Sequence, residues 1–524
     1  MAAARTIPAA AASAAERFGD RLGIVDGEAR LSYSDLFDQG RRFGAALVEA
    51  GVQPGDRVAI WAFNSAEWVV ALLGLSMAGA VLVPINTRWK GAEAADVLRR
   101  SRARLLVTVT GFLDTDYVAM LEGQDLPDLS TTVVMRTAAW EEFLDRATPS
   151  ALDEVDRRAA AVASGDPADI LFTSGTTGVP KGVVMPHERT LGVATDWVRM
   201  TGLGADDRYL MVNPYFHQFG LKAGILACLA SGAAMLPEAV FDVGRALARV
   251  AEERVTVFPG APTLYLSILD HPDRDRYDLS SLRVAVTGAA DIPVELIRRV
   301  NDELPFSVVI TGYGLTETGT ATSTAPDDDF ETVATTVGRP RPGFEVRIAD
   351  HDGKHLPPGE AGEVLVKGPT VMAGYLDDPD ATASALSTEG WLRTGDLGVL
   401  DDRGYLRIAG RIKDMFIVGG FNVYPAEIEN ALLRHPDVKQ AAVIGIPDDR
   451  LGEVGMAFVV TRSADQSAGG EILVWCRDQM ANYKVPRAIE LVDELPVNAT
   501  GKVVKDELRA RVMQSGHSHT SPTR

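Results

Sequence analysis

Short apolar segments alternate with segments of helical period through most of the chain. Residues 56–60 predict a strand, and residues 65–78 predict the helix that follows it. Further strands are predicted at residues 80–84, 104–109, 131–135 and 169–172, and parallel strands of a second layer at 282–286 and 306–310. Strands separated by helical segments in this way favour an α/β fold.

The pattern changes near residue 336. Three apolar segments separated by Pro-Gly and Asp-Gly turns, at 343–349, 362–366 and 404–408, predict an antiparallel, barrel-like subdomain. A short strand at 415–418 and a helix beginning near Pro425 then open a compact α+β unit. We therefore expect an α/β protein with a large N-terminal domain (1–410) of two α/β subdomains plus the barrel-like one, a connecting segment (411–414), a small C-terminal domain (415–510) and a disordered tail (511–524).

One uncharged apolar run, from Trp68 to Ile85, just reaches the length of a membrane-spanning helix. Gly74, Gly79 and Pro84 divide the run, so a buried helix followed by a buried strand is the favoured interpretation. The alanine-rich residues 1–15 lead directly into charged positions, which predicts a first helix and not a signal peptide.

Composition narrows the function classes. The 524 residues carry a net charge of −20, which argues against non-specific binding to nucleic acid or to an anionic membrane. Two cysteines, Cys228 and Cys476, exclude a disulfide scaffold and a cysteine-rich metal site, and they fit a reducing cytoplasm. Arginine supplies 42 of the 52 basic side chains, so each of the ten lysines is worth attention.

The strongest local motif follows the apolar strand at 169–172. It contains glycines, hydroxyl side chains and one lysine: Thr173, Ser174, Gly175, Thr176, Thr177, Gly178, Val179, Pro180, Lys181 and Gly182. Backbone N–H groups, hydroxyls and an ammonium in such a loop can wrap an anion, whereas the alternative is a flexible Gly/Thr linker. The glycine spacing does not match a Walker A loop, which disfavours a P-loop NTPase.

The motif resembles the phosphate loop of the adenylate-forming superfamily, which includes acyl-CoA synthetases, peptide-synthetase adenylation domains and beetle luciferases. Further segments match in the order of that family: Tyr313-Gly314-Leu315-Thr316-Glu317, Thr394-Gly395-Asp396, Gly410-Arg411-Ile412-Lys413-Asp414 and Asn498-Ala499-Thr500-Gly501-Lys502. The resemblance covers residues 15–510 and implies an acid–thiol ligase that uses ATP, CoA and Mg²⁺.

The resemblance also implies roles for individual residues. Lys502 would lie between the carboxylate and the α-phosphate during adenylation, Thr316 would touch that phosphate, and Glu317 would hold Mg²⁺. The loop from Thr173 to Lys181 would wrap the β- and γ-phosphates. The nucleoside would be held by Asp396 on the ribose, with Arg411 close by, and by residues that flank the adenine or adjoin it: Gly288, Ala289, Ala290, Gly312, Tyr313 and Gly314.

Lys413 marks the hinge of the family, about which the C-terminal domain rotates after the adenylate forms. One orientation would bring Lys502 into the active site. The other would bring in the face of Gly419, Gly420 and Phe421, which would line the tunnel for the CoA thiol.

The segment from Asn213 to Gly220 resembles the aromatic–histidine segment of acyl-CoA synthetases and places His217 at the gate of the acyl pocket. A histidine among apolar residues is often structural, and that alternative stays open. The segment contains no aspartate to pair an ammonium group, which favours an acid without an amino group. Residues 171–175, 216–228 and 419–425 together resemble actinobacterial synthetases that act on a steroid-derived indane-dione propanoate.

Several alternatives remain open at this point. The acid could be a medium-chain or aryl-alkanoic acid, or the chain could be an acyl-AMP ligase that loads a carrier protein. A luciferase-type oxidation shares the same motifs, whereas a non-catalytic relative would be expected to lack Lys502 or Glu317. We expect a cytoplasmic enzyme with no nucleic-acid partner and no membrane insertion, and the resemblance leaves a homodimer open.

Overall fold

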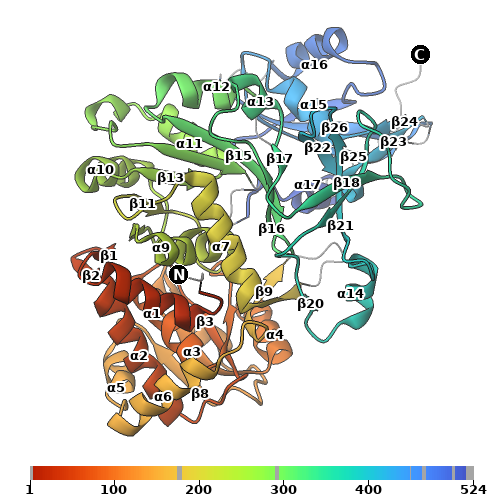
Figure 1. Cartoon of the computed structure of the whole chain (residues 1–524). Helices are drawn as coiled ribbons and strands as arrows, with labels where there is room; N and C mark the ends of the chain where they lie inside the picture. Colours follow the sequence, from red (N-terminus) through yellow and green to blue (C-terminus); the bar gives the residue numbers. More distant parts are fainter. Residues whose placement is uncertain are drawn as a thin grey trace.

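The computed structural model describes residues 4–173, 180–288, 294–419, 421–448, 450–462, 468–498 and 502–514. The predictions for Ser174 to Gly178, Ala289, Ala290, Gly420 and residues 515–524 of the tail fall outside this described part. In Figure 1 the red and orange N-terminal segments form the lower body, the green segments the upper left and the blue C-terminal segments the upper right.

The lower body is built on a seven-stranded sheet of order β20-β10-β9-β4-β3-β5-β8. Its strands are β3 (Arg57–Trp61), β4 (Val81–Pro84), β5 (Ala103–Thr108), β8 (Thr131–Val134), β9 (Pro167–Thr173), β10 (Lys181–Pro186) and β20 (Gly374–Tyr375). β3, β4, β5, β8 and β9 run parallel, and β10 and β20 complete the edge in antiparallel pairing. The strands predicted between residues 56 and 172 are therefore confirmed.

The second layer is a nine-stranded sheet of order β17-β16-β15-β14-β13-β11-β12-β1-β2. Its strands are β1 (Leu22–Asp26), β2 (Ala29–Ser32), β11 (Arg208–Met211), β12 (Ala234–Pro237), β13 (Val257–Gly260), β14 (Val284–Gly288), β15 (Val308–Leu315), β16 (Gly319–Ser323) and β17 (Arg339–Pro340). The predicted parallel pair is confirmed, because Val286 of β14 lies opposite Ile310 of β15. β1 comes from the start of the chain and pairs in parallel with β12.

Helices cover both sheets, and α7 crosses the centre of the molecule (Figure 1). α7 contacts β9 of the seven-stranded sheet and β16 of the nine-stranded sheet, so it links the two layers. The helices of these layers are α1 (Ile7–Phe18), α2 (Tyr33–Glu49), α3 (Ala66–Met77), α4 (Gly91–Ser101), α5 (Ala138–Leu144), α6 (Pro149–Ala161), α7 (His187–Thr201), α8 (Gln218–Gly220), the π-helix η2 (Leu221–Leu226), α9 (Ala227–Ser231), α10 (Val243–Glu253), α11 (Pro262–Leu269), α12 (Val294–Glu303) and α13 (Phe330–Thr335). Short 3-10 turns lie at η1 (Ala119–Leu121) and η3 (Arg274–Arg276), and a short hairpin pairs β6 (Thr110–Phe112) with β7 (Thr115–Asp116).

The apolar run from Trp68 to Ile85 forms most of α3 followed by β4, as predicted. Ser65 caps α3 by accepting a hydrogen bond from the backbone N–H of Trp68, and residues 68–77 are all buried. The lack of polar positions thus reflects a helix enclosed on all sides by the protein. Among the described residues, no helix is both long and apolar enough to cross a membrane.

The segment predicted to be barrel-like is a four-stranded antiparallel sheet of order β18-β19-β21-β22. Its strands are β18 (Glu345–Ala349), β19 (Gly362–Lys367), β21 (Leu392–Leu400) and β22 (Leu406–Arg411), and α14 (Pro379–Ala385) precedes β21. The antiparallel pairing is as predicted, and β18 and β22 stand at the two edges of an open sheet.

The short turn η4 (Ile412–Asp414) joins β22 to the C-terminal unit. Its sheet contains β23 (Phe416–Val418), β24 (Phe421–Val423), β25 (Val438–Asp448), β26 (Gly452–Thr461) and β27 (Ala488–Leu491), and its helices are α15 (Pro425–Leu432), α16 (Ala468–Gln479) and α17 (Lys505–Gln514). Separate apolar clusters line the two faces of this sheet, so the unit has its own core.

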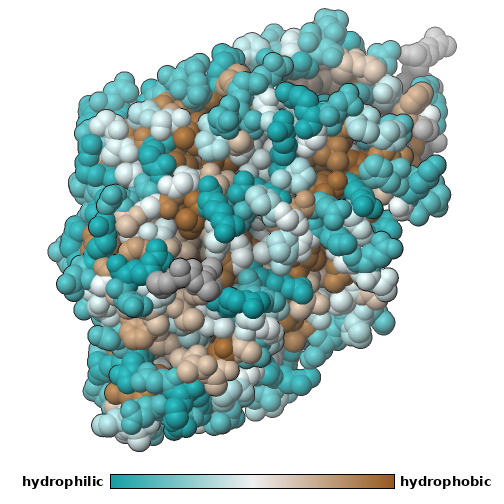
Figure 2. Space-filling model, viewed as in Figure 1, coloured by the Kyte–Doolittle hydropathy of each residue, from teal (hydrophilic) through white to brown (hydrophobic). Residues whose placement is uncertain are grey.

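The surface is mainly polar. On the face seen in Figure 2, hydrophilic residues predominate and hydrophobic residues appear in scattered patches. This distribution agrees with a chain in which 24% of the residues are charged and the net charge is −20.

Candidate functional site

The segment from Tyr313 to Glu317 runs from the end of β15 into the turn that leads to β16. A side chain at Gly314 would meet the carbonyl oxygen of Gly319 at 2.1 Å, so the two strands can approach this closely only with glycine here. The Oγ1 of Thr318 accepts a hydrogen bond from the N–H of Leu315 at 3.1 Å and closes the turn. The turn therefore holds Thr316 and Glu317 in a defined position, with Thr316 buried.

Tyr375 connects Glu317 to the predicted phosphate loop. Its hydroxyl donates a hydrogen bond to Oε1 of Glu317 at 3.0 Å, and the Nζ of Lys181 lies 5.0 Å from the centroid of its ring. Lys181 begins β10 and lies directly opposite Thr173, the last residue of β9. Both described ends of the loop and the predicted metal ligand thus belong to one site, although the sequence reasoning did not single out Tyr375.

Glu317 lies in a poorly solvated place. Burial is the main cause that raises the pKa of its carboxyl, and the hydrogen bond from Tyr375 and the charge of Arg411 oppose that rise. A desolvated carboxylate attracts a cation, and its oxygen is the kind of ligand that Mg²⁺ prefers. The residue therefore fits the predicted metal ligand.

Asp396 is the centre of a second group. It is 4% exposed, it accepts a hydrogen bond from the hydroxyl of Tyr313 at 2.7 Å, and its Oδ1 lies 3.1 Å from Nε of Arg411. Register explains the second contact, because Asp396 of β21 lies opposite Arg411 of β22. The structure thus brings together Tyr313, Asp396 and Arg411, which are far apart in the sequence. Burial raises the pKa of the Tyr313 hydroxyl, so this group remains a hydrogen-bond donor at neutral pH.

Gly288 and Gly312 are neighbours in parallel strands, with Gly288 at the end of β14 and Gly312 opposite it in β15. A Cβ at Gly288 would lie 2.8 Å from the carbonyl oxygen of Gly312. Glycine therefore permits β14 and β15 to approach each other closely here. The carboxyl end of such strands is where α/β sheets commonly bind ligands. Gly312 adjoins Tyr313 of the Asp396 group, so the predicted adenine-binding residues that the structure describes border that group.

His217 caps the short helix α8 and accepts a hydrogen bond on Nδ1 from the N–H of Phe219 at 3.2 Å. Burial, with the nearby charge of Lys222, lowers the pKa of His217 to about 4. The imidazole is therefore neutral at physiological pH and can contact a carboxylic acid only as an uncharged group.

Asn64 positions the segment before His217. Its Nδ2 donates to the carbonyl oxygens of Met211 and Asn213 at 3.0 and 2.9 Å, and its Oδ1 accepts from the N–H of Tyr215 at 2.8 Å. The sequence reasoning did not single out this residue. The sequence signal for it was weak: Asn64 is an amide residue between the apolar strand at 57–61 and the residue that caps α3.

The remaining predicted residues belong to the C-terminal part. The backbone N–H of Lys502 donates to Oδ1 of Asn498 at 3.0 Å, next to the bridge between Val497 and Val503. Lys413 is exposed in η4. Gly419 has a φ of +56°, a conformation that favours glycine, and Phe421 is 58% exposed with its ring 4.7 Å from that of Tyr483.

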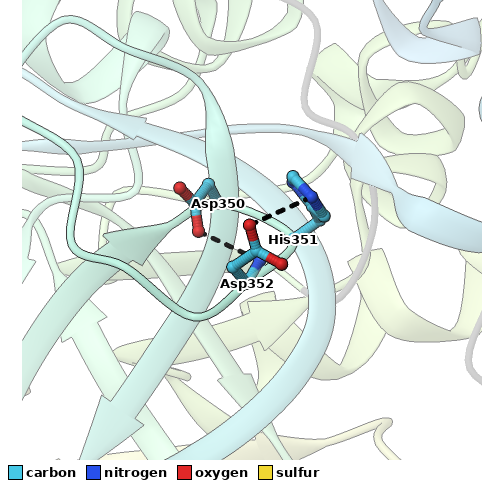
Figure 3. Close-up of side chains that lie close together, drawn as sticks. All are labelled: Asp350, His351 and Asp352. Carbon is cyan, nitrogen blue, oxygen red and sulfur yellow. Dashed lines mark hydrogen bonds and ion pairs between the residues drawn. The ribbon is translucent and has the colours of Figure 1, made fainter.

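A separate acidic group lies on the surface at Asp350, His351 and Asp352 (Figure 3). One oxygen of Asp350 accepts hydrogen bonds from the N–H groups of Asp352 and Lys354, and the side chains of His351 and Asp352 are 89% and 77% exposed. These bonds stabilise a tight turn. The group shares no residue with the site around Glu317 and Asp396.

Comparisons with known proteins identify the family of this chain. The model of the AMP-binding enzyme family matches residues 11–376, and the model of the AMP-binding enzyme C-terminal domain matches residues 427–502. The chain belongs to the AMP-binding enzyme family. It is an AMP-forming acyl-CoA ligase of the adenylate-forming superfamily.

Two relatives carry the name 3-[(3aS,4S,7aS)-7a-methyl-1,5-dioxo-octahydro-1H-inden-4-yl]propanoyl:CoA ligase. The one from Rhodococcus jostii (strain RHA1) is 49% identical over 515 residues, covering 96% of this chain and 98% of the relative. The one from Mycobacterium tuberculosis (strain ATCC 25618 / H37Rv) is 49% identical over 510 residues, with the same coverage.

A solved structure has the same architecture. The anthranilate CoA ligase AuaEII in complex with anthranoyl-AMP has a TM-score of 0.87 and 30% sequence identity to this chain, with 97% of this chain and 98% of the other covered. The predicted fold class is therefore confirmed, with a large N-terminal α/β domain and a small C-terminal domain.

Proposed function

We propose that this acyl-CoA ligase works in two steps at one site. In the first step a carboxylate oxygen attacks the α-phosphorus of ATP, and the bond to the β-phosphate breaks to give acyl-AMP and pyrophosphate. In the second step the sulfur of CoA attacks the acyl carbonyl, AMP leaves with the electron pair of the broken C–O bond, and the thiol proton is released. Three groups of residues support the first step.

The first of these groups would bind the triphosphate. Thr173 and Lys181 lie opposite each other at the base of the loop, and Lys181 stands beside Tyr375, which bonds to Glu317. Lys181 would neutralise charge on the β- and γ-phosphates, while Thr316 would donate its hydroxyl to the α-phosphate. When bound through Glu317, Mg²⁺ would stabilise the charge that develops on the phosphate oxygens.

The second group would bind the nucleoside. Asp396 accepts from Tyr313 and pairs with Arg411, and these two contacts would orient its carboxylate toward the ribose hydroxyls. Gly288 and Gly312 let neighbouring strands approach closely beside the place that we propose for the base. The third group would bind the acid, with the neutral imidazole of His217 at the entrance to the acyl pocket.

We further propose that the chain alternates between two arrangements about a hinge at 411–414. Support comes from the position of η4 between β22 and the separate core of the C-terminal unit, with exposed Lys413 in its middle. In this proposal Lys502 serves the adenylation step, and Gly419, Gly420 and Phe421 face the CoA thiol in the second step. The boundaries would be 1–410 for the N-terminal domain and 415–510 for the C-terminal domain.

For the acid we propose a steroid-derived indane-dione propanoate. The observation that carries this proposal is the 49% identity, over 96% of the chain, to two ligases named for that substrate. The free thiols of Cys228 and Cys476 support a reducing compartment, so we propose that the reaction takes place in the cytoplasm.

A panel of acids tests the proposal. The enzyme is incubated with ATP, Mg²⁺ and CoA plus the indane-dione propanoate, octanoate, 3-phenylpropanoate or anthranilate, and AMP and thioester are measured by mass. We expect both products with the indane-dione acid, with kcat/KM at least about tenfold above the other acids, a difference of about 1.4 kcal/mol.

Other outcomes would replace parts of the proposal. A preference for octanoate or 3-phenylpropanoate would assign a medium-chain or aryl-alkanoic substrate. AMP formation with a carrier protein but no CoA thioester would assign an acyl-AMP ligase. No AMP with any acid would contradict the proposed reaction.

A further inference from the structure

A charged pair lies in the interior between the two large layers of the protein. The Nζ of Lys222 is 3.0 Å from Oδ1 of Asp169, and the two side chains are 0% and 1% exposed. Burying an ammonium and a carboxylate is costly even when they are paired, and an apolar pair of similar volume usually stabilises a core at least as well. The cost of burying this pair therefore indicates a role other than stabilising the fold.

Asp169 belongs to the strand that leads into the phosphate loop. It lies in β9, opposite Met185 of β10, and β9 ends at Thr173. Its second oxygen, Oδ2, accepts a hydrogen bond from the hydroxyl of Thr190 in α7. Any displacement of Asp169 along its strand would be passed to the loop that begins four residues later.

Lys222 belongs to the segment that carries His217. It lies in the π-helix η2, which follows α8, and the carbonyl oxygen of His217 accepts a hydrogen bond from the N–H of Leu221 at 2.9 Å. π-helical turns are rare and often occur at functional sites, because they redirect side chains at a cost in backbone geometry. The charge of Lys222 also reaches the His217 imidazole.

The pair joins two layers at the point where each supplies part of the site. β9 belongs to the seven-stranded sheet, whereas η2 connects β11 and β12 of the nine-stranded sheet. An ion pair favours a short distance between two specific atoms, whereas apolar contacts permit sliding.

We propose that Lys222 and Asp169 are positioning residues for adenylation, which hold the acid-binding segment at His217 in register with the phosphate loop. The proposal rests on the two-step function described above. Misplacement of two reacting groups by about 1 Å can cost about a hundredfold in rate. Loss of the pair would therefore affect the adenylation step and leave the attack of CoA on preformed acyl-AMP largely unchanged.

The main variant is the double substitution Lys222→Met with Asp169→Leu, because it replaces both charges by apolar groups of similar volume. Thr190→Val is a milder change, since it removes only the hydrogen bond to Asp169. Lys439→Met, at an exposed lysine of β25, is the matched control. Thermal unfolding is measured for every variant.

Adenylation is measured as acid-dependent pyrophosphate exchange, and the second step as thioester formation from supplied acyl-AMP. We expect the double variant to unfold within a few degrees of the parent, to lose about tenfold or more in adenylation with a raised KM for the acid, and to keep thioester formation. Thr190→Val should change adenylation in the same direction by about two- to fivefold. Lys222→Arg, made in the parent with Asp169 unchanged, keeps the charge. Its adenylation should therefore fall less than that of the double variant.

Amide hydrogen exchange tests the link without any substrate. Exchange should rise together in residues 168–173 and 217–222 of the double variant, and stay unchanged in β25 and β26 of the C-terminal sheet. Unchanged exchange in both segments, or equal loss of both half-reactions, would overturn the proposal. An inactive parent with the expected exchange pattern would contradict the proposed function but not the link between the segments.

Discussion

At the scale of single residues, the site depends on hydrogen bonds that hold carboxylates in place. Tyr375 bonds to Glu317, and Tyr313 and Arg411 hold Asp396 from two sides. A carboxylate that is oriented before substrate binds does not have to be reorganised during the reaction. Such preorganisation is usually the largest electrostatic contribution to catalysis. These partners are therefore as important for the geometry as the carboxylates themselves.

Tyr375→Phe removes only the hydroxyl that bonds to Glu317. A hydrogen bond to a charged group contributes about 1.5 kcal/mol or more, so we expect the KM for MgATP in adenylation to rise about tenfold. Steady-state pyrophosphate exchange at varied MgATP measures the effect. Tyr405→Phe is the matched control, because Tyr405 donates its hydroxyl to Asp328 outside the site. An unchanged KM in Tyr375→Phe would contradict the predicted role of Glu317.

At the scale of elements, the tight pair of β15 and β16 explains why the sequence between them can present Thr316 and Glu317. The pairing changes register between Tyr313 and Gly314, and Gly319 begins β16 with a φ of +71°. Two glycines thus permit the close turn that carries Thr316 and Glu317.

Gly314→Ala should disturb this turn. The added Cβ would lie 2.1 Å from the carbonyl oxygen of Gly319, so the strands must separate. We expect the free energy of unfolding to fall by about 2 kcal/mol and adenylation to fall by about tenfold or more. Urea unfolding and pyrophosphate exchange measure the two effects. Gly165→Ala is the control, because a Cβ there meets nothing within 4 Å. Full adenylation in Gly314→Ala would show that the turn tolerates displacement.

At the scale of the whole molecule, the proposed function uses segments that come from separate layers and from the C-terminal unit. If the C-terminal domain alternates between two orientations, its residues serve different steps. Lys502→Ala should therefore reduce adenylation by about a hundredfold or more and leave thioester formation from supplied acyl-AMP within about twofold. Single-turnover assays of the two half-reactions check this expectation. Equal loss of both would refute the division of labour.

Packing between distant segments also makes the stability depend on pH. His187 at the start of α7 is buried, accepts a hydrogen bond from the N–H of Ile7, and has a pKa lowered to about 4 by burial. In the unfolded chain this imidazole binds a proton near pH 6.5, whereas in the folded chain it binds one only near pH 4. The folded state is therefore destabilised relative to the unfolded state as the pH falls through this window. The loss for this one group approaches about 3 kcal/mol.

His187→Asn keeps an acceptor for Ile7 but removes the titrating group. We expect the urea midpoint of the variant to fall less than that of the parent between pH 7 and pH 4.5. Part of the dependence should remain, because burial lowers the pKa of His217 in the same direction. An identical fall in both proteins would contradict the prediction.

Much of the fold was predictable from the sequence because its signals are local. Apolar periodicity placed β3, α3, β4 and the pair β14–β15, and the order of short motifs indicated the adenylate-forming family. The resemblance to that family also implied roles for individual residues, whose side chains suit phosphates, ribose and Mg²⁺, and these roles stay predictions. These features depend on residues that are close together in the chain.

Other features were decided only by the tertiary structure. The contact between Tyr375 and Glu317 joins residues 58 positions apart, and the bond from Asn64 to Asn213 joins residues 149 positions apart. The pairing of β1 with β12, and the ion pair of Lys222 with Asp169, likewise join distant segments. No local pattern encodes such neighbours, because they follow from how whole layers pack together. The sequence determined the family and the chemistry of this protein, and the packing of its layers determined which residues hold that chemistry in place.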